Sequence, residues 1–439
     1  MEKLLNVFKS KFGHNVSWLM AGRIYQMAIN LVVAMLTARY LGPSNYGLIN
    51  YAASFTALLT SFCTLGTNDT IVNQFVTDKE NQGKTLGSVI TFRILSSILS
   101  VITITLIVFM IKPDEPLTVW VAFLYSLSLI FQSFESINYW YQYNLKSKTT
   151  SRIYMVAYTV VAVYKVILLV LKKNVLFFAV SNAIDYMVVA ILLLISYHKQ
   201  NGSAYPLSFD LKLGLSILKK SYHYIISGMM VAVYGQMDKI MIGHILSEKE
   251  VGYYTASLTV STIWTFVLTA IIDSSRSIIM PLFEKDKKLY EKRLTQLYSA
   301  IIYISFAVAV LMTVFSKLII TILYGKDYLP AVSSLHIVAW STGFSYLGVA
   351  RSIWLVQNKQ QKYEKYIALI GSLCNLCLNF ALIRVWGIVG AAIATLFTQI
   401  ITNVIAGLFI PEIRPNSILI LKAFNIVSVL KGIKNQEES

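Results

Sequence analysis

Apolar segments of about 20 residues alternate with short polar segments along the whole 439-residue chain. A run of about this length crosses the hydrocarbon core of a bilayer as an α-helix. The pattern therefore predicts twelve membrane-spanning helices. Their expected ranges are about 14–38, 46–66, 86–111, 116–142, 153–171, 174–197, 221–246, 251–273, 297–323, 331–356, 364–386 and 388–411.

The composition excludes an ordinary soluble protein. Hydrophobic residues make up 56% of the chain and charged residues 13%, and the mean hydropathy is +0.62. Soluble domains carry roughly 25% charged residues. The polar segments between the apolar runs are too short to form a soluble domain, so we expect an all-α integral membrane protein.

Two repeated segments indicate that the chain consists of two related halves. The segment LGPSNYGLINYA at 41–52 reappears in degraded form as LSEKEVGYYTAS at 246–257, and WYQYNLKSK at 140–148 parallels WLVQNKQQK at 354–362. An even number of predicted spans separates the copies, so both halves have the same orientation in the membrane. Parallel repeats of this kind are typical of transporters. We expect two parallel-repeat bundles of six helices each.

The longest polar segments and the tail suggest the domain boundaries. We predict an N-terminal six-helix lobe at 1–198, a cytoplasmic linker at 199–220, a C-terminal six-helix lobe at 221–412 and a cytoplasmic amphipathic tail at 413–439. The apolar part of the tail is too short to span a bilayer and is typical of a helix that lies at the membrane surface.

The basic residues that give the net charge of +17 are distributed unevenly among the loops. Of the 38 Lys and Arg residues, 25 fall in the terminal segments and the even-numbered loops, and 7 fall in the odd-numbered loops. Cytoplasmic loops of membrane proteins carry the excess of basic residues. We therefore place both termini in the cytoplasm and expect no nucleic-acid partner.

Polar side chains line one face of two predicted spans. The two sets are Arg23, Gln26 and Asn30 in the first span and Gln132, Glu135 and Tyr139 in the fourth. Each set recurs at helical spacing, which places its members on a common face. Such a face either lines a path for a polar substrate or joins packed helices through hydrogen bonds, and both interpretations are open.

Ionisable residues inside the predicted spans indicate function more strongly. The cations are Arg23, Arg93, Lys165, Lys239 and Arg351. Packing alone does not require so many charges in a membrane. Arg23 and Arg351 are the preferred phosphate ligands because a guanidinium binds phosphate with two parallel hydrogen bonds, and Lys165 or Lys239 would assist. Arg93 is expected to extend to the lipid headgroups, since it lies near a span end.

Three carboxylates inside the spans are candidates for coupling transport to an ion gradient. They are Glu135, Asp185 and Asp238. A carboxylate inside the membrane can exchange H⁺ or hold Na⁺. Static ion pairs with neighbouring cations are the alternative. Apart from such an ion, we expect no cofactor and no metal site.

The chain carries no signature of an enzyme. A phosphate-binding Gly-x-x-x-x-Gly-Lys-Ser/Thr segment and a His-Glu-x-x-His segment are both absent from the sequence. Energy for transport would then come from a gradient or from consumption of the substrate on the far side.

Two segments resemble a known family: ARYLGPSNYG at 38–47 and Leu65-Gly66-Thr67. With the length, the twelve spans and the parallel halves, the chain resembles the polysaccharide-export branch of the multidrug/oligosaccharidyl-lipid/polysaccharide exporters, and within it the Wzx-type flippases for O-antigen or capsule repeat units. The resemblance implies a transporter that moves polyprenyl-pyrophosphate-linked oligosaccharide across the bacterial inner membrane by alternating access. It also implies membrane lipids, a polysaccharide polymerase and chain-length machinery as partners.

Two other functions stay open. A cation-coupled multidrug antiporter shares the implied fold, and the carboxylates would favour it if they outweighed the cations in one open cavity. Relatives that export drugs tend to rely on acidic residues in the first lobe, whereas the first span here carries Arg23 and Asn30. A membrane polysaccharide polymerase is less favoured, because such enzymes have a large external loop and no such loop is predicted here.

Overall fold

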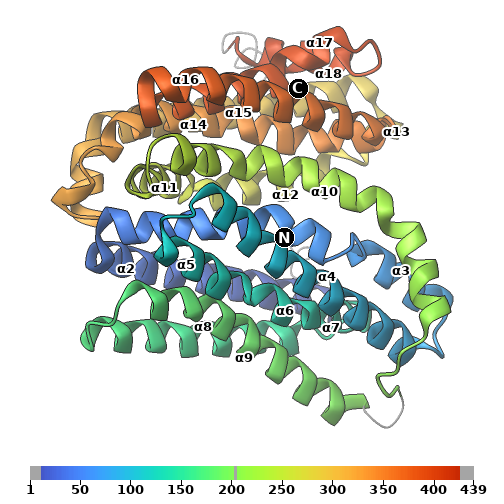
Figure 1. Ribbon diagram of the computed structural model, residues 1–439. Coiled ribbons are helices and arrows are strands. Elements are labelled where there is room, and N and C mark those ends of the chain that lie inside the picture. Colours follow the sequence, from blue (N-terminus) through green and yellow to red (C-terminus); the bar gives the residue numbers. More distant parts are fainter. Residues whose placement is uncertain (1–10, 202–204, 426–439) are drawn as a thin grey trace. The chain divides into compact units, whose positions relative to one another are not determined.

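The computed structural model describes residues 11–201 and 205–425, and every regular element in these two ranges is a helix. The chain divides into two compact units, Met1–Ala232 and Val233–Ser439, and the boundary falls inside one long helix, α10. Figure 1 shows the helices of each unit.

The first unit contains the helices up to the first part of α10. They are α2 (Lys11–Cys63), α3 (Asn68–Thr77), α4 (Gln82–Ile111), α5 (Pro116–Ser126), α6 (Ser128–Gln132), the 3₁₀ helix η1 (Ser133–Glu135), α7 (Ser136–Tyr143), α8 (Ser147–Val170), α9 (Val175–Asn201) and α10 (Leu211–Ile245). Helix α8 packs between α2 and α9, and α8 and α9 run side by side in Figure 1. Trp140, Tyr141 and Tyr197 lie in its buried apolar core.

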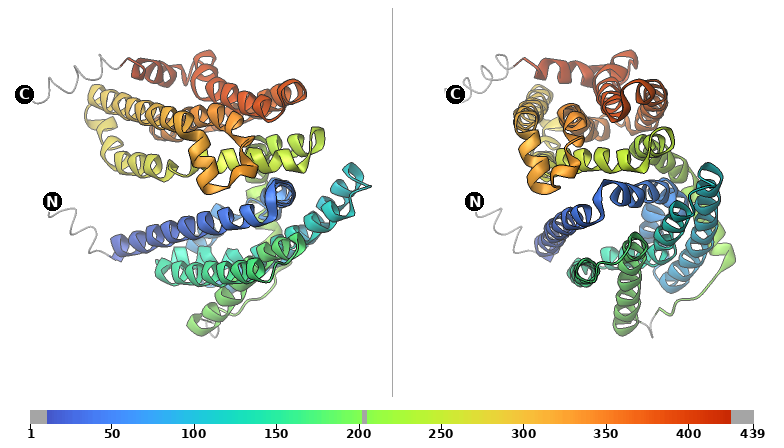
Figure 2. Two further views of the ribbon diagram at one scale, coloured as in Figure 1. Left: turned by 90° about the vertical axis from the view of Figure 1, so that its left-hand side faces the viewer. Right: turned by 60° about the vertical axis from the view of Figure 1, so that its left-hand side comes forward.

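The second unit contains the last part of α10 and the helices after it. They are α11 (Glu248–Thr262), α12 (Thr265–Ile279), α13 (Leu282–Lys285), α14 (Lys287–Leu323), η2 (Lys326–Tyr328), α15 (Ala331–Gln357), η3 (Gln361–Tyr363), α16 (Glu364–Ile400), the π-helix η4 (Ile401–Ile405), α17 (Ala406–Phe409) and α18 (Arg414–Ala423). Helices α14 and α15, gold to orange in Figure 2, pack along each other. Helix α18 forms the first part of the predicted tail, and residues 426–439 of that tail lie outside the described residues. Helix α18 buries Leu419 and Ile420 in the core around α14 and exposes Ile418 and Leu421.

Within the described ranges, nine helical segments are long and apolar enough to cross a membrane. Two of them, Ile24–Cys63 and Gln361–Phe409, each overlap with two of the twelve predicted spans. One more predicted span corresponds to the continuous helix α15. Its apolar sequence contains several Ser and Thr residues, and it is not among the nine. The all-helical membrane fold is thus confirmed, and the count of twelve crossings stays a prediction.

The long helix α2 is divided by a turn at Gly42. Its backbone there has φ of 69° and ψ of 173°, and Pro43 follows. Positive φ is open to glycine at little steric cost, and proline suits the first turn of the helix that comes next. The segment that marks the first sequence repeat is therefore a turn between two apolar helices. In the second copy the corresponding residue, Ser247, has an extended backbone and caps α11.

The second repeat has the same local structure in both copies. Asn144 donates its side-chain amide to the Trp140 carbonyl at 2.9 Å, and Asn358 does the same to the Trp354 carbonyl at 2.9 Å. The next residue in each copy, Leu145 or Lys359, has a positive φ of 52° or 56°. Both turns thus end a helix with one left-handed residue. This shared geometry supports the duplication that the sequence predicts.

Candidate functional site

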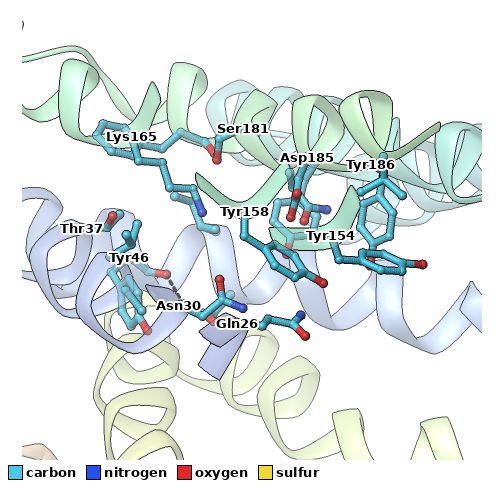
Figure 3. Close-up of a pocket in the computed structure, with 18 of the residues that line it drawn as sticks. Gln26, Asn30, Thr37, Tyr46, Tyr154, Tyr158, Lys165, Ser181, Asp185 and Tyr186 are labelled. Atoms are coloured by element: carbon cyan, nitrogen blue, oxygen red, sulfur yellow. Dashed lines mark hydrogen bonds between the residues drawn. The ribbon is translucent and has the colours of Figure 1, made fainter. Parts of the chain in front are cut away.

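A polar pocket of about 370 Å³ lies within the first unit (Figure 3). Helices α2, α5, α8 and α9 and the 3₁₀ helix η1 supply its walls. The lining residues are Gln26, Asn30, Val33, Ala34, Thr37, Tyr46, Ile49, Asn50, Tyr125, Glu135, Tyr154, Tyr158, Lys165, Phe178, Ser181, Asn182, Asp185, Tyr186 and Val189. Most of them are polar or aromatic, although the helices themselves are long and apolar.

Helix α2 presents one face to the pocket on each side of its turn. Gln26, Asn30 and Thr37 follow helical spacing before Gly42, and Tyr46 and Asn50 follow it afterwards. Asn50 donates to the Tyr46 carbonyl at 2.7 Å, which fixes the amide at the pocket wall. The predicted polar face of the first span is therefore a pocket wall at Gln26 and Asn30.

Three charged side chains line the pocket, and all three were predicted from the sequence. Lys165 extends from α8 across the pocket, and Asp185 comes from α9 (Figure 3). Glu135 comes from η1. Tyr154 donates its hydroxyl to Glu135 Oε1 at 2.8 Å. Asp185 Oδ1 is buried and accepts no hydrogen bond from the residues that the structure describes. No direct ion pair joins Lys165 to either carboxylate in the described ranges.

The predicted polar face of the fourth span is only partly a pocket wall. Of its members, Glu135 lines the pocket, whereas Gln132 does not and Tyr139 packs against the apolar core. For Tyr139 the reason is the backbone: a 3₁₀ helix at Ser133–Glu135 separates α6 from α7. A 3₁₀ helix has 3.0 residues per turn, so Tyr139, which follows it, leaves the face that an uninterrupted α-helix would present. Gln132 precedes the 3₁₀ helix in α6, and the 3₁₀ helix does not explain its absence from the wall.

The preferred phosphate ligand in the first unit cannot be assessed in the same way. Arg23 lies in α2, but its side chain is outside those that the structure describes. It precedes Gln26 by three residues and Asn30 by seven, which is the spacing of one helical face. Its role stays a prediction.

Arg93 does not extend to the lipid headgroups, so that expectation is wrong. The residue is 2% exposed, and its Nε and Nη2 donate to Thr67 Oγ1 at 3.0 and 2.6 Å. Nη2 also donates to Asn68 Oδ1 at 2.7 Å. A guanidinium with oxygen acceptors close by can stay inside the protein. Arg93 thus joins α4 to the break between α2 and α3.

A second polar cluster surrounds Asp238 inside the second unit. Asp238 is 7% exposed, and its Oδ2 accepts from Tyr254 Oη at 2.8 Å and from Thr395 Oγ1 at 2.6 Å. Its Oδ1 accepts from Asn379 Nδ2 at 2.5 Å, and that amide also donates to Asn375 Oδ1 at 2.9 Å. Asn379 Oδ1 is buried without a hydrogen-bond partner among the described residues. A carboxylate and several neutral oxygens therefore meet in one buried place.

Lys239 and Arg351 also lie in the second unit. Lys239 Nζ donates to Gln236 Oε1 at 3.1 Å and makes no ion pair with Asp238 in the described residues. Arg351 is 7% exposed, and its Nη1 donates to the Thr402 carbonyl at 3.0 Å, within the π-helix. Its Nε is buried without a hydrogen-bond partner in the described part of the chain. A π-helix displaces carbonyls from the α-helical pattern, which is how this carbonyl becomes an acceptor for a side chain.

Sequence reasoning missed the aromatic part of the first-unit pocket. Tyr46, Tyr125, Tyr154, Tyr158 and Tyr186 all line it. Tyr154 and Tyr158 are four residues apart on α8, and their rings stack with centroids 6.0 Å apart and an angle of 22°. Aromatic residues at helical spacing are usually core residues, so the signal was present but not distinctive.

The pocket can bind a molecule that carries many hydrogen-bonding groups. Amides such as those of Asn30 and Asn182 both donate and accept, carboxylates accept, and Lys165 donates. Tyrosines add flat apolar faces with a polar end. Groups of three or more His, Cys, Asp or Glu residues able to hold a metal ion are absent from the described residues.

Two comparisons of sequence show similarity to polysaccharide biosynthesis proteins. The profile of a family described as polysaccharide biosynthesis protein matches residues 36–333. The capsular polysaccharide biosynthesis protein CapF of Staphylococcus aureus is 19% identical over 398 residues, which cover 88% of this chain and 96% of CapF.

Solved structures share the fold at low sequence identity. The lipid II flippase MurJ in an inward closed conformation has a TM-score of 0.71 and 18% identity, with 92% of this chain and 91% of MurJ covered. An inward-facing multidrug resistance transporter of the MATE family has a TM-score of 0.66 and 14% identity, with 90% and 96% covered. The fold is therefore that of membrane transporters.

Proposed function

The chain belongs to the polysaccharide biosynthesis protein family, and on that premise we propose that it is a flippase for lipid-linked oligosaccharides. This membership agrees with the resemblance carried by residues 38–47 and 65–67. The substrate would be a polyprenyl-pyrophosphate-linked repeat unit for O-antigen, capsule or exopolysaccharide, moved across the bacterial inner membrane. The observation that carries the proposal is the polar, aromatic pocket inside a unit of long apolar helices.

A flippase has to shelter a large polar headgroup while its lipid tail stays in the membrane. Gln26, Asn30 and Lys165 line the pocket and are our substrate-binding residues there, with Gln132 and Tyr139 assigned to the same path on sequence grounds alone. The pocket would open to the two membrane faces in turn. Without such shelter, each unpaired polar group in the hydrocarbon region would cost several kcal/mol.

The pyrophosphate would be held by cations, for which Arg23, Lys239 and Arg351 are the candidates. Support comes from Arg351, since its buried Nε has no acceptor and could donate to a phosphate oxygen. A guanidinium can bind one phosphate through two hydrogen bonds. A lysine such as Lys239 would add a point charge without fixing the orientation.

We assign ion coupling in the second unit to Asp238. Its carboxylate lies next to the side-chain oxygens of Tyr254 and Thr395 and to Asn379, whose Oδ1 lacks a partner. Hard cations prefer such oxygen ligands, and a proton is the other candidate for this carboxylate. Glu135 and Asp185 are the coupling candidates in the first unit.

The orientation of the chain stays a prediction, with both termini expected in the cytoplasm. A test uses the exposed Lys219 near the start of α10. A cysteine placed there, Lys219→Cys, should react with a membrane-impermeant thiol reagent in inverted vesicles and not in intact cells. Labelling in intact cells would contradict the orientation. A polysaccharide polymerase and its chain-length machinery are the expected partners on the far side.

Reconstitution tests the proposed function directly. Purified protein is placed in liposomes that carry a polyprenyl-pyrophosphate-linked disaccharide, and a membrane-impermeant glycosidase measures the fraction exposed on the outside. We expect exposure to rise with time above that of protein-free liposomes, and Asp238→Asn to remove the response to a Na⁺ or H⁺ gradient. The exposed Asp327, changed to Asn, is the matched control in the same unit.

A cation-coupled drug antiporter is the second candidate, and one observation favours it. Glu135 and Asp185 outnumber Lys165 in the pocket. Deletion of the gene in its native host separates the two functions. Accumulated lipid-linked repeat units and lost surface polysaccharide support the flippase, whereas intact polysaccharide with increased drug sensitivity supports the antiporter.

A further inference from the structure

We propose that the first turns of helix α8, together with the start of α2, form a binding site for a lipid whose headgroup carries two phosphate groups. The site consists of Trp18, Lys148 and Arg152 and lies within the first unit, apart from the polar pocket. It goes beyond the proposed function, because a lipid can bind there whatever the pocket carries.

The packing of α2 against α8 places two cations beside one tryptophan ring. Gly22 of α2 lies against Ser151 of α8, where a methyl group on the glycine would lie 3.4 Å from the serine Cβ. One turn earlier on α2, the ring of Trp18 meets Lys148 Nζ and Arg152 Cζ, each 5.2 Å from its centroid. Cations are attracted to the face of an indole at such distances. The ring therefore holds both positive charges close together.

No carboxylate neutralises these two cations. Lys148 and Arg152 are four residues apart on α8, so they share a face and repel each other. Neither makes an ion pair with a described residue. The carboxylate of Glu135 reaches α8 but accepts from Tyr154, which is two residues after Arg152 and therefore lies on another side of the helix. An anion between the two cations would relieve their repulsion.

The surrounding segments contain basic residues and no acidic ones. Helix α8 packs against α2, α7 and α9. At this end of the unit these helices comprise residues 11–30, 136–160 and 186–201, which include neither Asp nor Glu. Residues 1–10 bring two lysines against one glutamate, so they do not reverse the sign. The basic residues of the three segments are Lys11, Arg23, Lys146, Lys148, Arg152 and Lys199.

The site lies at the level of the lipid headgroups. The apolar segment of α2 that is able to cross a membrane begins at Ile24, and that of α8 begins at Ser147. Trp18 thus lies just before one span, and Lys148 lies at the start of the other. Tryptophan gathers at the membrane–water interface, and lysine or arginine near a span end extends to the headgroups.

The same face of α8 continues as an apolar surface into the membrane. Val156, Val160 and Val163 follow Arg152 at helical spacing, and all three are exposed. A lipid can therefore place its tail along these valines and its phosphates beside the two cations. The guanidinium can bind two phosphate oxygens side by side, and the lysine adds a point charge for the second phosphate.

The experiment measures lipid binding to the purified full chain in detergent by native mass spectrometry. The probes are diphosphatidylglycerol with oleoyl chains and a polyprenyl pyrophosphate, which each carry two phosphates, and dioleoylphosphatidylcholine as the zwitterionic reference. The variants are Lys148→Gln and Arg152→Gln. Lys146→Gln is the matched control, because it removes the same charge two residues away. The Lys146 ammonium lies 5.1 Å from the centroid of the buried Trp140 ring and donates to Gln200 Oε1 at 3.3 Å.

We expect the two-phosphate lipids to bind more tightly than the zwitterionic lipid. Lys148→Gln and Arg152→Gln should each weaken binding of a two-phosphate lipid about fivefold, and Lys146→Gln less than about twofold. A larger loss for diphosphatidylglycerol identifies a membrane phospholipid as the ligand, a larger loss for the polyprenyl pyrophosphate identifies the substrate lipid, and equal losses show that the site takes both.

Equal weakening by all three variants would overturn the site, because the attraction would then belong to the basic surface in general. Unchanged binding in both site variants, or equally tight binding of the zwitterionic lipid, would also overturn it. None of these results bears on the transport measured in liposomes, so the flippase function stands or falls separately.

Discussion

The hydrogen bonds between Arg93 and Thr67 allow a quantitative test of how the first unit holds a charge in its interior. Thr67 Oγ1 accepts from Nε at 3.0 Å and from Nη2 at 2.6 Å, and it donates to the Thr64 carbonyl at 2.8 Å. Thr67→Val keeps the shape and removes the acceptor. Nη2 keeps Asn68 as a partner, whereas the buried Nε loses its acceptor.

The expected loss in free energy of unfolding is about 3 kcal/mol. A hydrogen bond to a charged group contributes about 1.5–3 kcal/mol, and a buried donor left without a partner costs a similar amount. Thr77→Val is the matched control, because Thr77 also donates to a backbone carbonyl, that of Asn73 at 2.6 Å, but is exposed on α3. The control should lose at most about 1 kcal/mol, so the difference assigned to Arg93 is about 2 kcal/mol.

Cys63 provides the assay, because its thiol is 3% exposed and lies four residues before Thr67. In a background with Cys374 and Cys377 changed to Ser, the rate of thiol labelling under native conditions measures how often this region opens. A loss of about 2 kcal/mol corresponds to labelling roughly 30-fold faster than in Thr77→Val.

A double-mutant cycle isolates the pair. Arg93→Met removes the charge, so Thr67→Val should cost much less in that background, with a coupling free energy of about 2 kcal/mol. Equal labelling rates for Thr67→Val and Thr77→Val would refute the reasoning. Arg93 would then be held by other groups, and its extension to the headgroups would again be open.

Two further predictions concern backbone geometry. A methyl group on Gly87 would lie 2.3 Å from the carbonyl oxygen of Ser208, in the segment that leads to α10. Gly87→Ala should therefore lower the melting temperature in detergent. A methyl group on Gly235 meets nothing within 4 Å, so Gly235→Ala should leave the melting temperature unchanged or raise it. Asn144→Ala and Asn358→Ala each remove one side-chain bond to a helix-end carbonyl, so each should cost about 1 kcal/mol in chemical unfolding. Clearly unequal costs would argue against equivalent turns in the two halves.

Part of the pocket could be predicted because helical spacing is a local property. Gln26 and Asn30 share a face of one continuous helix, and the structure places both in the pocket wall. The same reasoning does not extend to Gln132 and Tyr139, which are not in the pocket wall. For Tyr139, a 3₁₀ helix at Ser133–Glu135 changes the residues per turn before it. The sequence contains no Pro or Gly at that point from which a change in helix type could be predicted.

The sequence by itself determined the membrane class, the helical fold and the repeated turns, because these follow from apolar length, from composition and from contacts between residues a few positions apart. Only the tertiary structure decided which charges meet. Lys165 and Asp185 are on different helices and line one pocket. Arg93 instead donates hydrogen bonds to Thr67, at the break between two helices. The partners of a buried charge come from distant parts of the chain, and the packing of several helices sets their distances and the water they exclude.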